Sequence, residues 1–169
     1  MSISMYQTSI PVFIHGLTNL SAILNKAAAY AEAKKFDSAV WVNTRLAPDM
    51  FPLSRQVQIA TDIIKGGAAR LAGVEIPKYD DNEATIAELR TRIEKTSKFL
   101  ETIKASQIDG SEEKAISLKV GGNDLNFKGQ DYLLNFVIPN FYFHITTTYA
   151  ILRNNGVDVG KMDFLGKIQ

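Results

Sequence analysis

The sequence contains no cysteine, only two histidines and almost no net charge. Without cysteine, disulfide frameworks, cysteine-ligated zinc, iron–sulfur clusters and thiol nucleophiles are excluded. Nineteen basic and eighteen acidic residues leave a formal net charge of +1, so bulk charge gives no basis for binding nucleic acid or an anionic membrane. No apolar run approaches the roughly 20 residues that cross a bilayer, and residues 1–5 lack the basic start of a signal peptide. We therefore expect a cytoplasmic protein that binds neither nucleic acid nor membranes.

Common catalytic motifs are also missing. The sequence has no G-x-S-x-G elbow, P-loop, G-x-G-x-x-G, H-E-x-x-H or E-x-x-H pattern. Its Gly121-Gly122 pair is not followed directly by a helix, as a phosphate site would require. Motifs therefore assign no reaction to the chain.

Helical periodicity dominates what is present. The length of 169 residues fits one domain over residues 1–169. A core of this size needs no disulfide or structural metal to be stable. Apolar residues recur at spacings of three, four or seven from about 10 to 34, 52 to 73, 85 to 103 and 130 to 155. These patterns predict four helices.

Several residues mark the ends and interruptions of these helices. The first helix starts either at Ser9, with Pro11 in its first turn, or near Ser4, with a kink at Pro11. Thr85 to Glu88 match the capping box that starts a helix. Pro139 removes one backbone hydrogen bond near the middle of the fourth helix, which predicts a kink there.

A β-hairpin is predicted between the third and fourth helices. Apolar and polar residues alternate from 116 to 127 on both sides of a turn at residues 121–124. Two strands alone are marginally stable, so the hairpin must pack against the helices. The connections at residues 36–51 and 74–84 are long for a simple helical hairpin, and we expect at least one to cross over the end of the helices.

Several polar and small residues in and before the second helix are expected to serve packing, ion pairing or capping. Gly66-Gly67 indicates close approach of a neighbouring helix. Asp62 and Arg70 are typical of a surface or interhelical ion pair. Asp49 is placed to cap the start of the helix, and Gln56 borders its apolar face.

The outer face of the third helix carries charges of alternating sign. Such a face is typical of a solvated helix and not of a nucleic-acid surface. We therefore expect these side chains to be exposed: Glu88, Arg90, Arg92, Glu94, Lys95 and Lys98.

Polar residues interrupt the apolar stripe of the fourth helix. Asn140 and His144 lie one turn apart on the face predicted to point inward. A buried amide or imidazole costs roughly 1–3 kcal/mol unless it is hydrogen-bonded. In one interpretation the two side chains are hydrogen-bonded within the core, to each other, to a backbone carbonyl freed at Pro139 or to water. In the other they form a ligand or metal site. His15 is either a rim residue or a second metal ligand beside His144, and one imidazole alone is too few for zinc or nickel.

Six stretches, covering nearly the whole chain, carry a resemblance to a known family. They are residues 45–53, 56–60, 69–73, 141–144, 149–157 and 160–166. Through them the chain resembles an uncharacterised family of domain-of-unknown-function proteins within the DinB/YfiT-like superfamily of metalloenzymes. The resemblance implies an all-α, DinB-like four-helix bundle with a long crossover, to which the small β-hairpin between helices 3 and 4 is added.

The same resemblance implies a metal site that this sequence has partly lost. DinB-like proteins typically bind nickel or zinc through one histidine of the second helix and an H-x-x-x-H pair of the fourth, and some transfer low-molecular-weight thiols. Here His144 aligns with the later histidine of the pair and Asn140 with the earlier one. Gln56 or Gln58 is the nearest substitute in the second helix. One imidazole and two amides would bind a first-row metal poorly.

We therefore predict a protein with a degenerate metal site and no resident cofactor, which binds an unknown small molecule or partner. The predicted polar pocket comprises His144, Asn140, Gln56, Asp49 and Tyr149. The alternative is a divalent-metal-dependent enzyme, a thiol transferase or hydrolase, with nickel or zinc bound by His144. A homodimer formed through helix faces is a further possibility.

Overall fold

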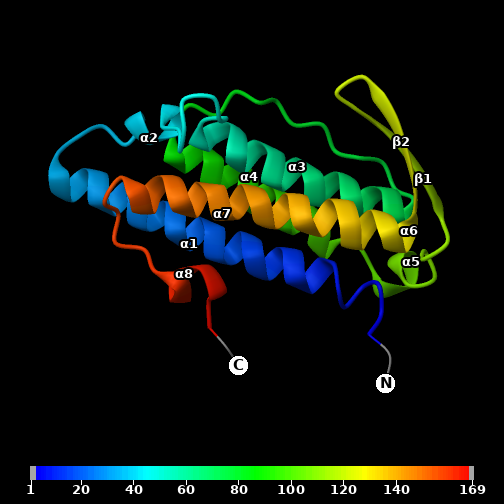
Figure 1. The fold of residues 1–169 in the computed structure, drawn as a ribbon. Coiled ribbons are helices and arrows are strands. Elements are labelled where there is room, and N and C mark those ends of the chain that lie inside the picture. Colours follow the sequence, from blue (N-terminus) through cyan, green and yellow to red (C-terminus); the bar gives the residue numbers. More distant parts are fainter. Residues whose placement is uncertain (1–2, 168–169) are drawn as a thin grey trace.

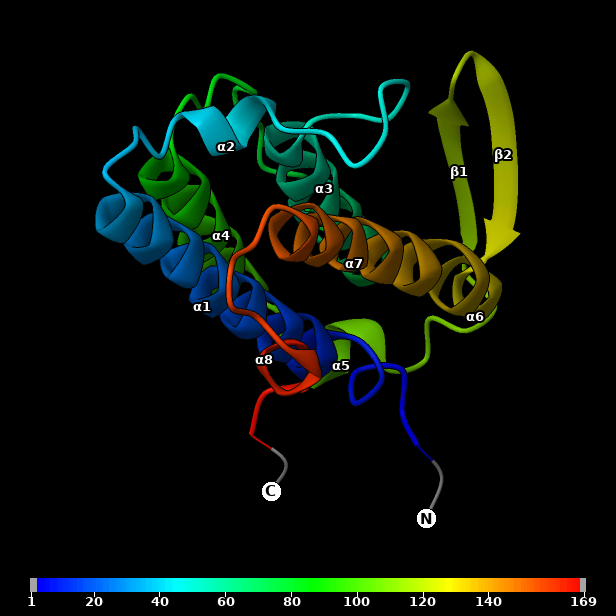
Figure 2. The ribbon, with the colours of Figure 1, turned by 60° about the vertical axis from the view of Figure 1, so that its left-hand side comes forward.

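Four long helices lie side by side in the computed structural model, which describes residues 3–167 (Figures 1 and 2). The elements are α1 (Ile10–Lys34), α2 (Val40–Asn43), α3 (Leu53–Ala72), α4 (Ile86–Glu101), α5 (Ala105–Ile108), β1 (Ala115–Val120), β2 (Asn123–Lys128), α6 (Gly129–Asp131), η1 (Tyr132–Val137), α7 (Ile138–Asn154) and α8 (Lys161–Leu165). The predicted domain also includes residues 1, 2, 168 and 169, which lie outside the described residues. Within residues 3–167, the structure contains no helix with the length and apolar character needed to cross a membrane.

Helix α3 packs against both α4 and α7, and α1 packs against the opposite sides of the same two helices. Helices α3 and α4 run in the same direction, because residues 74–84 return along the outside of the helices from the end of α3 to the start of α4 (Figure 1). The connection is long, as expected, but it runs along the helices and does not cross over their end (Figure 1). The core between the helices is apolar, and its largest fully buried side chains include Phe13, Leu17, Leu53, Ile64 and Phe141.

The start of α1 distinguishes the two sequence alternatives. The helix begins at Ile10, with Pro11 in its first turn. Ser9 precedes it, but its side chain makes no capping hydrogen bond and Oγ instead donates to the Met5 carbonyl at 2.7 Å. The capping box of α4 is confirmed, since Thr85 accepts from the Glu88 N–H and the Glu88 carboxylate accepts from the Thr85 N–H.

The chain around Pro139 forms a π-helix where the sequence predicts a kink. Residues of η1 widen the turn directly before α7, and the helix continues through α6, η1 and α7 in both views (Figures 1 and 2). Proline has no N–H and its ring collides with the carbonyl four residues earlier, so a wider turn relieves both problems. Asn140 Nδ2 donates to the Phe136 carbonyl at 2.7 Å and thereby binds one carbonyl of the widened turn.

The Gly66-Gly67 pair permits close packing, as predicted. A Cβ atom on Gly67 would lie 2.8 Å from Cγ1 of Val137 in η1, so only glycine lets η1 approach α3 this closely. Gly66 leaves room for a side chain of its own helix, since a Cβ there would lie 2.6 Å from the guanidinium of Arg70.

Two expectations about charged residues are wrong. Arg92 was expected on the solvated face of α4 but is only 3% exposed, and three carboxylates surround it. Asp62 pairs with Lys65 and Arg92, whereas Arg70 donates to the Tyr132 hydroxyl at 3.1 Å. For Arg92 the reason is the long return of residues 74–84, which brings Asp81 and Glu83 onto a face that helix periodicity marks as external. Asp62 instead has nearer basic partners on α3 and α4.

The predicted hairpin is present, with β1 and β2 antiparallel and Val120 paired with Asn123. Gly121 and Gly122 both adopt positive φ angles, as a two-residue hairpin turn of this hand requires. The hairpin packs against the helices through buried Ile116 and through Phe127, whose ring lies 5.7 Å from that of Tyr132.

Candidate functional site

His144 of α7 and Gln56 of α3 form a direct hydrogen bond where the two helices meet. Nδ1 of His144 lies 2.7 Å from Oε1 of Gln56, and both side chains are buried. Nε2 of Gln56 donates to the Phe51 carbonyl at 3.0 Å. Since a backbone carbonyl can only accept, this bond orients the amide so that its oxygen faces the imidazole. Nδ1 of His144 therefore carries the proton and donates it to Gln56.

The second ring nitrogen of His144 is consequently an unprotonated acceptor. Burial and, to a smaller extent, the positive charge of Arg55 lower the pKa of His144 from 6.5 to about 4. Within residues 3–167, Ser111 Oγ is the sole fully buried side-chain polar atom without a partner. No described residue hydrogen-bonds Nε2 of His144 either, so this atom retains contact with solvent. The ring is thus neutral at physiological pH, and its Nε2 is an unprotonated hydrogen-bond acceptor.

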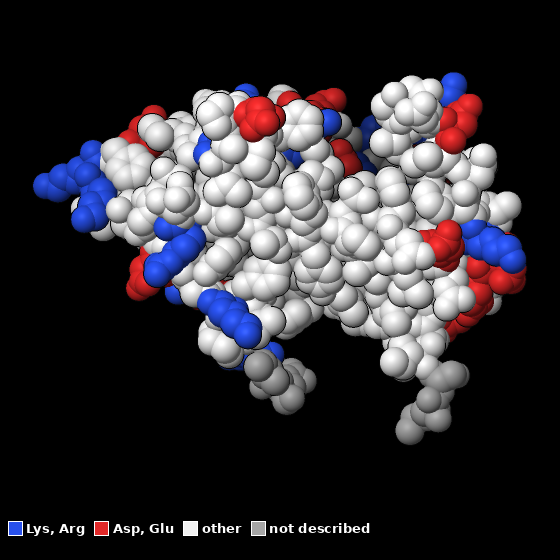
Figure 3. All heavy atoms as spheres, viewed as in Figure 1, with Lys and Arg blue, Asp and Glu red and all other residues white. Residues whose placement is uncertain are grey.

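An uncharged hollow lies over α7, and Phe143, which packs against His144, is one of its walls, although His144 itself does not line it. Its volume is about 380 Å³ and its lining residues are Leu46, Pro139, Tyr142, Phe143, Thr146, Thr147 and Ala150. The exposed ring of Phe143 meets the His144 ring edge to face, with centroids 5.1 Å apart. The surface over α7 and α1 is largely uncharged, with charged side chains gathered toward its margins (Figure 3). The arrangement suits a ligand with an apolar body.

The structure brings together two of the five residues predicted to form the pocket, Gln56 and His144. Asn140 is half-buried and binds the Phe136 carbonyl instead of His144. Tyr149 donates to the Val159 carbonyl at 3.4 Å and packs on Phe164.

Asp49 does not cap α3, so that prediction is wrong. Asp49 is exposed, and Pro52 occupies the N-cap position without a side-chain hydrogen bond. His15 of α1 donates from Nε2 to the Leu165 carbonyl at 2.7 Å, and so tethers the C-terminal segment. Neither Asp49 nor His15 has a hydrogen bond to His144 or Gln56.

The residues at the pair do not fit a divalent metal centre. Residues 3–167 contain no group of three His, Cys, Asp or Glu side chains that could hold a metal ion. Two ligands of one tetrahedral zinc, each about 2.0–2.1 Å from it, lie about 3.3 Å apart. Nδ1 of His144 and Oε1 of Gln56 are 2.7 Å apart, which is a hydrogen-bond separation. The atom of Gln56 that could face a metal is therefore engaged by the histidine.

Sequence reasoning missed the groups that fix this pair. The Phe51 carbonyl is a backbone group with no residue-type signature, and only the loop before α3 brings it to Gln56. Arg55 precedes Gln56 in the sequence, but its influence on His144 depends on the packing of α3 against α7.

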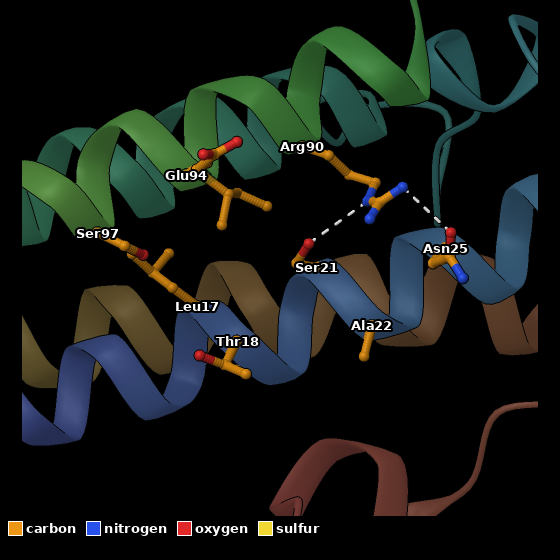
Figure 4. A pocket seen from close by; sticks show the side chains of 9 residues that line it. Leu17, Thr18, Ser21, Ala22, Asn25, Arg90, Glu94 and Ser97 are labelled. Atoms are coloured by element: carbon orange, nitrogen blue, oxygen red, sulfur yellow. Dashed lines mark hydrogen bonds between the residues drawn. The ribbon is translucent and has the colours of Figure 1, made fainter.

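A second hollow of about 400 Å³ lies between α1 and α4 (Figure 4). Arg90 crosses it from α4 and donates to Ser21 Oγ at 3.4 Å and to Asn25 Oδ1 at 3.1 Å. Small side chains such as Ala22 and Ser97 form much of the remaining wall. The charged side chains of Arg90 and Glu94 line this hollow. The hollow over α7 has an uncharged lining that includes Phe143, whose ring packs against His144, so it is the better candidate.

Comparison with known proteins gives the following similarities. The family model described as "Domain of unknown function (DUF1993)" matches residues 5–165. The chain is also similar to the crystal structure of a DinB family member protein from Shewanella denitrificans, with 45% sequence identity and a TM-score of 0.86. That match covers 96% of this chain and 92% of the other. No curated protein is significantly similar to the chain.

Proposed function

Since the chain belongs to the DUF1993 family, an uncharacterised DinB-like family, we propose that it is a small-molecule-binding protein built on a DinB-type four-helix bundle. Its binding site is the polar pair His144–Gln56 together with the uncharged hollow beside it. The position of a DinB-type metal has become a hydrogen bond between two side chains.

The observation that carries this proposal is the Nδ1–Oε1 hydrogen bond of 2.7 Å. In a DinB-like metal site the corresponding side chains of the second and fourth helices converge on an ion. In this chain they converge on each other, and the Phe51 carbonyl fixes the amide that holds the imidazole. This contact holds Nε2 as an acceptor, and the low pKa of His144 keeps that atom unprotonated.

The proposed ligand follows from the chemistry of the hollow. Leu46, Tyr142 and Phe143 provide apolar and aromatic walls, and Thr147 lies one turn after Phe143 on the same helix. The hollow contains no charged side chain. A neutral ligand with an aromatic or aliphatic body and one hydroxyl or N–H donor would match these walls and the acceptor at His144.

NMR titration with phenol and toluene tests this assignment, because the two probes differ in the donor. We expect phenol to shift the backbone amides of Phe143 and Thr147, and to bind roughly 3–10 times more tightly than toluene through one hydrogen bond. His144→Leu should abolish the preference, while His15→Gln should leave it unchanged. Absence of shifts at these amides, or a preference that survives in His144→Leu, would refute the proposal.

Metal titration distinguishes the alternative function. Chelator-treated protein should bind neither nickel nor zinc with a stoichiometry that depends on His144, as measured by isothermal titration calorimetry. Stoichiometric binding that disappears in His144→Leu would instead support a metal-dependent enzyme with His144 as a ligand.

A further inference from the structure

Residues 79–83, here named the strap, form the part of the return segment that lies against α3 and α4. Four of its contacts involve charged side chains. Glu83 and Asp81 each lie 3.0 Å from Arg92, Glu83 accepts from Gln58 at 2.9 Å, and Asp81 lies 2.5 Å from Arg55. Charge pairs with α3 and α4 therefore hold the strap in place.

Arg92 is the centre of this attachment. It is 3% exposed, and α3 fixes its guanidinium through Thr61 at 2.7 Å and Asp62 at 2.8 Å. Its remaining donor reaches the strap, where the Asp80 carbonyl also accepts at 3.2 Å. A buried guanidinium needs partners, and the strap supplies two of its three carboxylates.

Tyr79 adds a second charge-based contact. The ammonium groups of Lys65 and Lys95 lie 3.7 and 4.1 Å from the centre of its ring. Lys65 is only 4% exposed and pairs with Asp62 at 2.7 Å. The strap thus covers two basic side chains, Lys65 and Arg92, that would otherwise face solvent or another anion.

Apolar packing contributes little to the strap itself. Asp80, Asp81 and Asn82 are exposed, and Tyr79 and Glu83 are half-buried. The preceding part of the return segment differs, since Val74 packs against the hydrophobic core. The half-exposed pair of Asp81 and Arg55 weakens as salt screens it, whereas the buried pair of Glu83 and Arg92 is screened less and is better tested by removing its charge.

We propose that residues 79–83 are a charge-latched strap that opens as a unit, without unfolding of the helices, when its ion pairs with Arg92 are neutralised or screened. Opening exposes a basic surface formed by Arg92 and Lys65. It also releases Arg55, which directly precedes Gln56 on α3 and is held by Asp81. The strap is therefore connected to the helical turn that orients His144.

Backbone order parameters measured by NMR relaxation test the strap in the full-length protein. In Glu83→Gln we expect those of residues 79–83 to fall from about 0.85, typical of rigid backbone, to about 0.6 or below, because one charge-assisted contact to Arg92 is lost. Asp80→Asn is the matched control, since it removes one negative charge from the same segment but the Asp80 carboxylate forms no ion pair with a described residue. One molar sodium chloride should lower the order parameters of the same residues in the unmodified protein.

A second pair of variants tests the strap from the helix side. Arg92→Met should lower the order parameters of residues 79–83, whereas Arg90→Met, which removes the arginine that contacts Ser21 and Asn25 across the other groove, should not (Figure 4). If Arg92→Met fails to fold, Glu83→Gln still decides the matter. Unchanged order parameters in Glu83→Gln, or an equal loss in residues 86–101, would overturn the proposal, because the strap would then either stay closed or open only together with α4.

Discussion

The protonation of His144 should make stability depend on pH in a defined window. Burial lowers the pKa of this imidazole from 6.5 to about 4 in the folded protein, so the unfolded chain binds a proton in that range while the folded chain does not. Above the pKa of the unfolded chain, His144 is neutral in both states and the protein keeps its full free energy of unfolding. As the pH falls from about 6.5 to about 4, protonation of the unfolded chain lowers that free energy. Between about pH 7 and about pH 4.5 the loss amounts to about 2 kcal/mol.

The chain offers a clean assay, because it has two histidines and a single tryptophan. Trp41 is buried and reports urea unfolding by fluorescence. We compare the pH dependence of the unfolding free energy in the unmodified protein, His144→Gln and the control His15→Gln. Carboxylates titrate in all three proteins, so the difference between curves isolates the histidine.

We expect the loss of stability between about pH 7 and about pH 4.5 to be about 2 kcal/mol smaller in His144→Gln and unchanged in His15→Gln. NMR of the ring protons should place the titration of His144 near pH 4. Parallel curves for all three proteins, or a His144 midpoint near 6.5, would refute the buried neutral imidazole.

Three further predictions follow from packing and from the His144–Gln56 contact. Urea unfolding of Gln56→Leu, His144→Leu and the double variant should show a coupling of about 1–2 kcal/mol, because each single change leaves one buried polar partner unpaired, and additive effects would contradict the contact. Gly67→Ala should destabilise the protein by about 1–3 kcal/mol through overpacking against η1, whereas Gly160→Ala, with open space around it, should change the midpoint little. Gln56→His combined with Asn140→His should create calorimetrically detectable nickel or zinc binding, which either single variant should lack.

Local sequence patterns predicted the helices and the hairpin well, since their causes are local. The bounds of α1, the capping box at Thr85 and the turn at Gly121-Gly122 all depend on residues within a few positions of each other. The π-helix directly before Pro139 was not predicted, because a proline in a helical pattern indicates an interruption but not the hydrogen-bond pattern that replaces the regular turn.

The site was predicted only in part for a related reason. Inward-facing positions of α3 and α7 identified Gln56 and His144, because helical spacing determines which face is buried. Asn140 was predicted to share that face, yet its amide donates to the carbonyl of Phe136 within the π-helix. Arg92 was misplaced on the surface, because no pattern within α4 records that residues 79–83 return to cover it.

The hydrogen bond between Gln56 and His144 also bears on how far this sequence stands, in base changes, from the histidine set that the family resemblance implies. Codons for glutamine and histidine differ only in the third base, and those for asparagine and histidine only in the first. Each amide at a position that aligns with a DinB-type histidine is therefore one base change from an imidazole. Two such base changes, at Gln56 and Asn140, separate this sequence from the three histidines that the family resemblance implies. With glutamine at position 56, the buried imidazole of His144 has a hydrogen-bond acceptor for Nδ1.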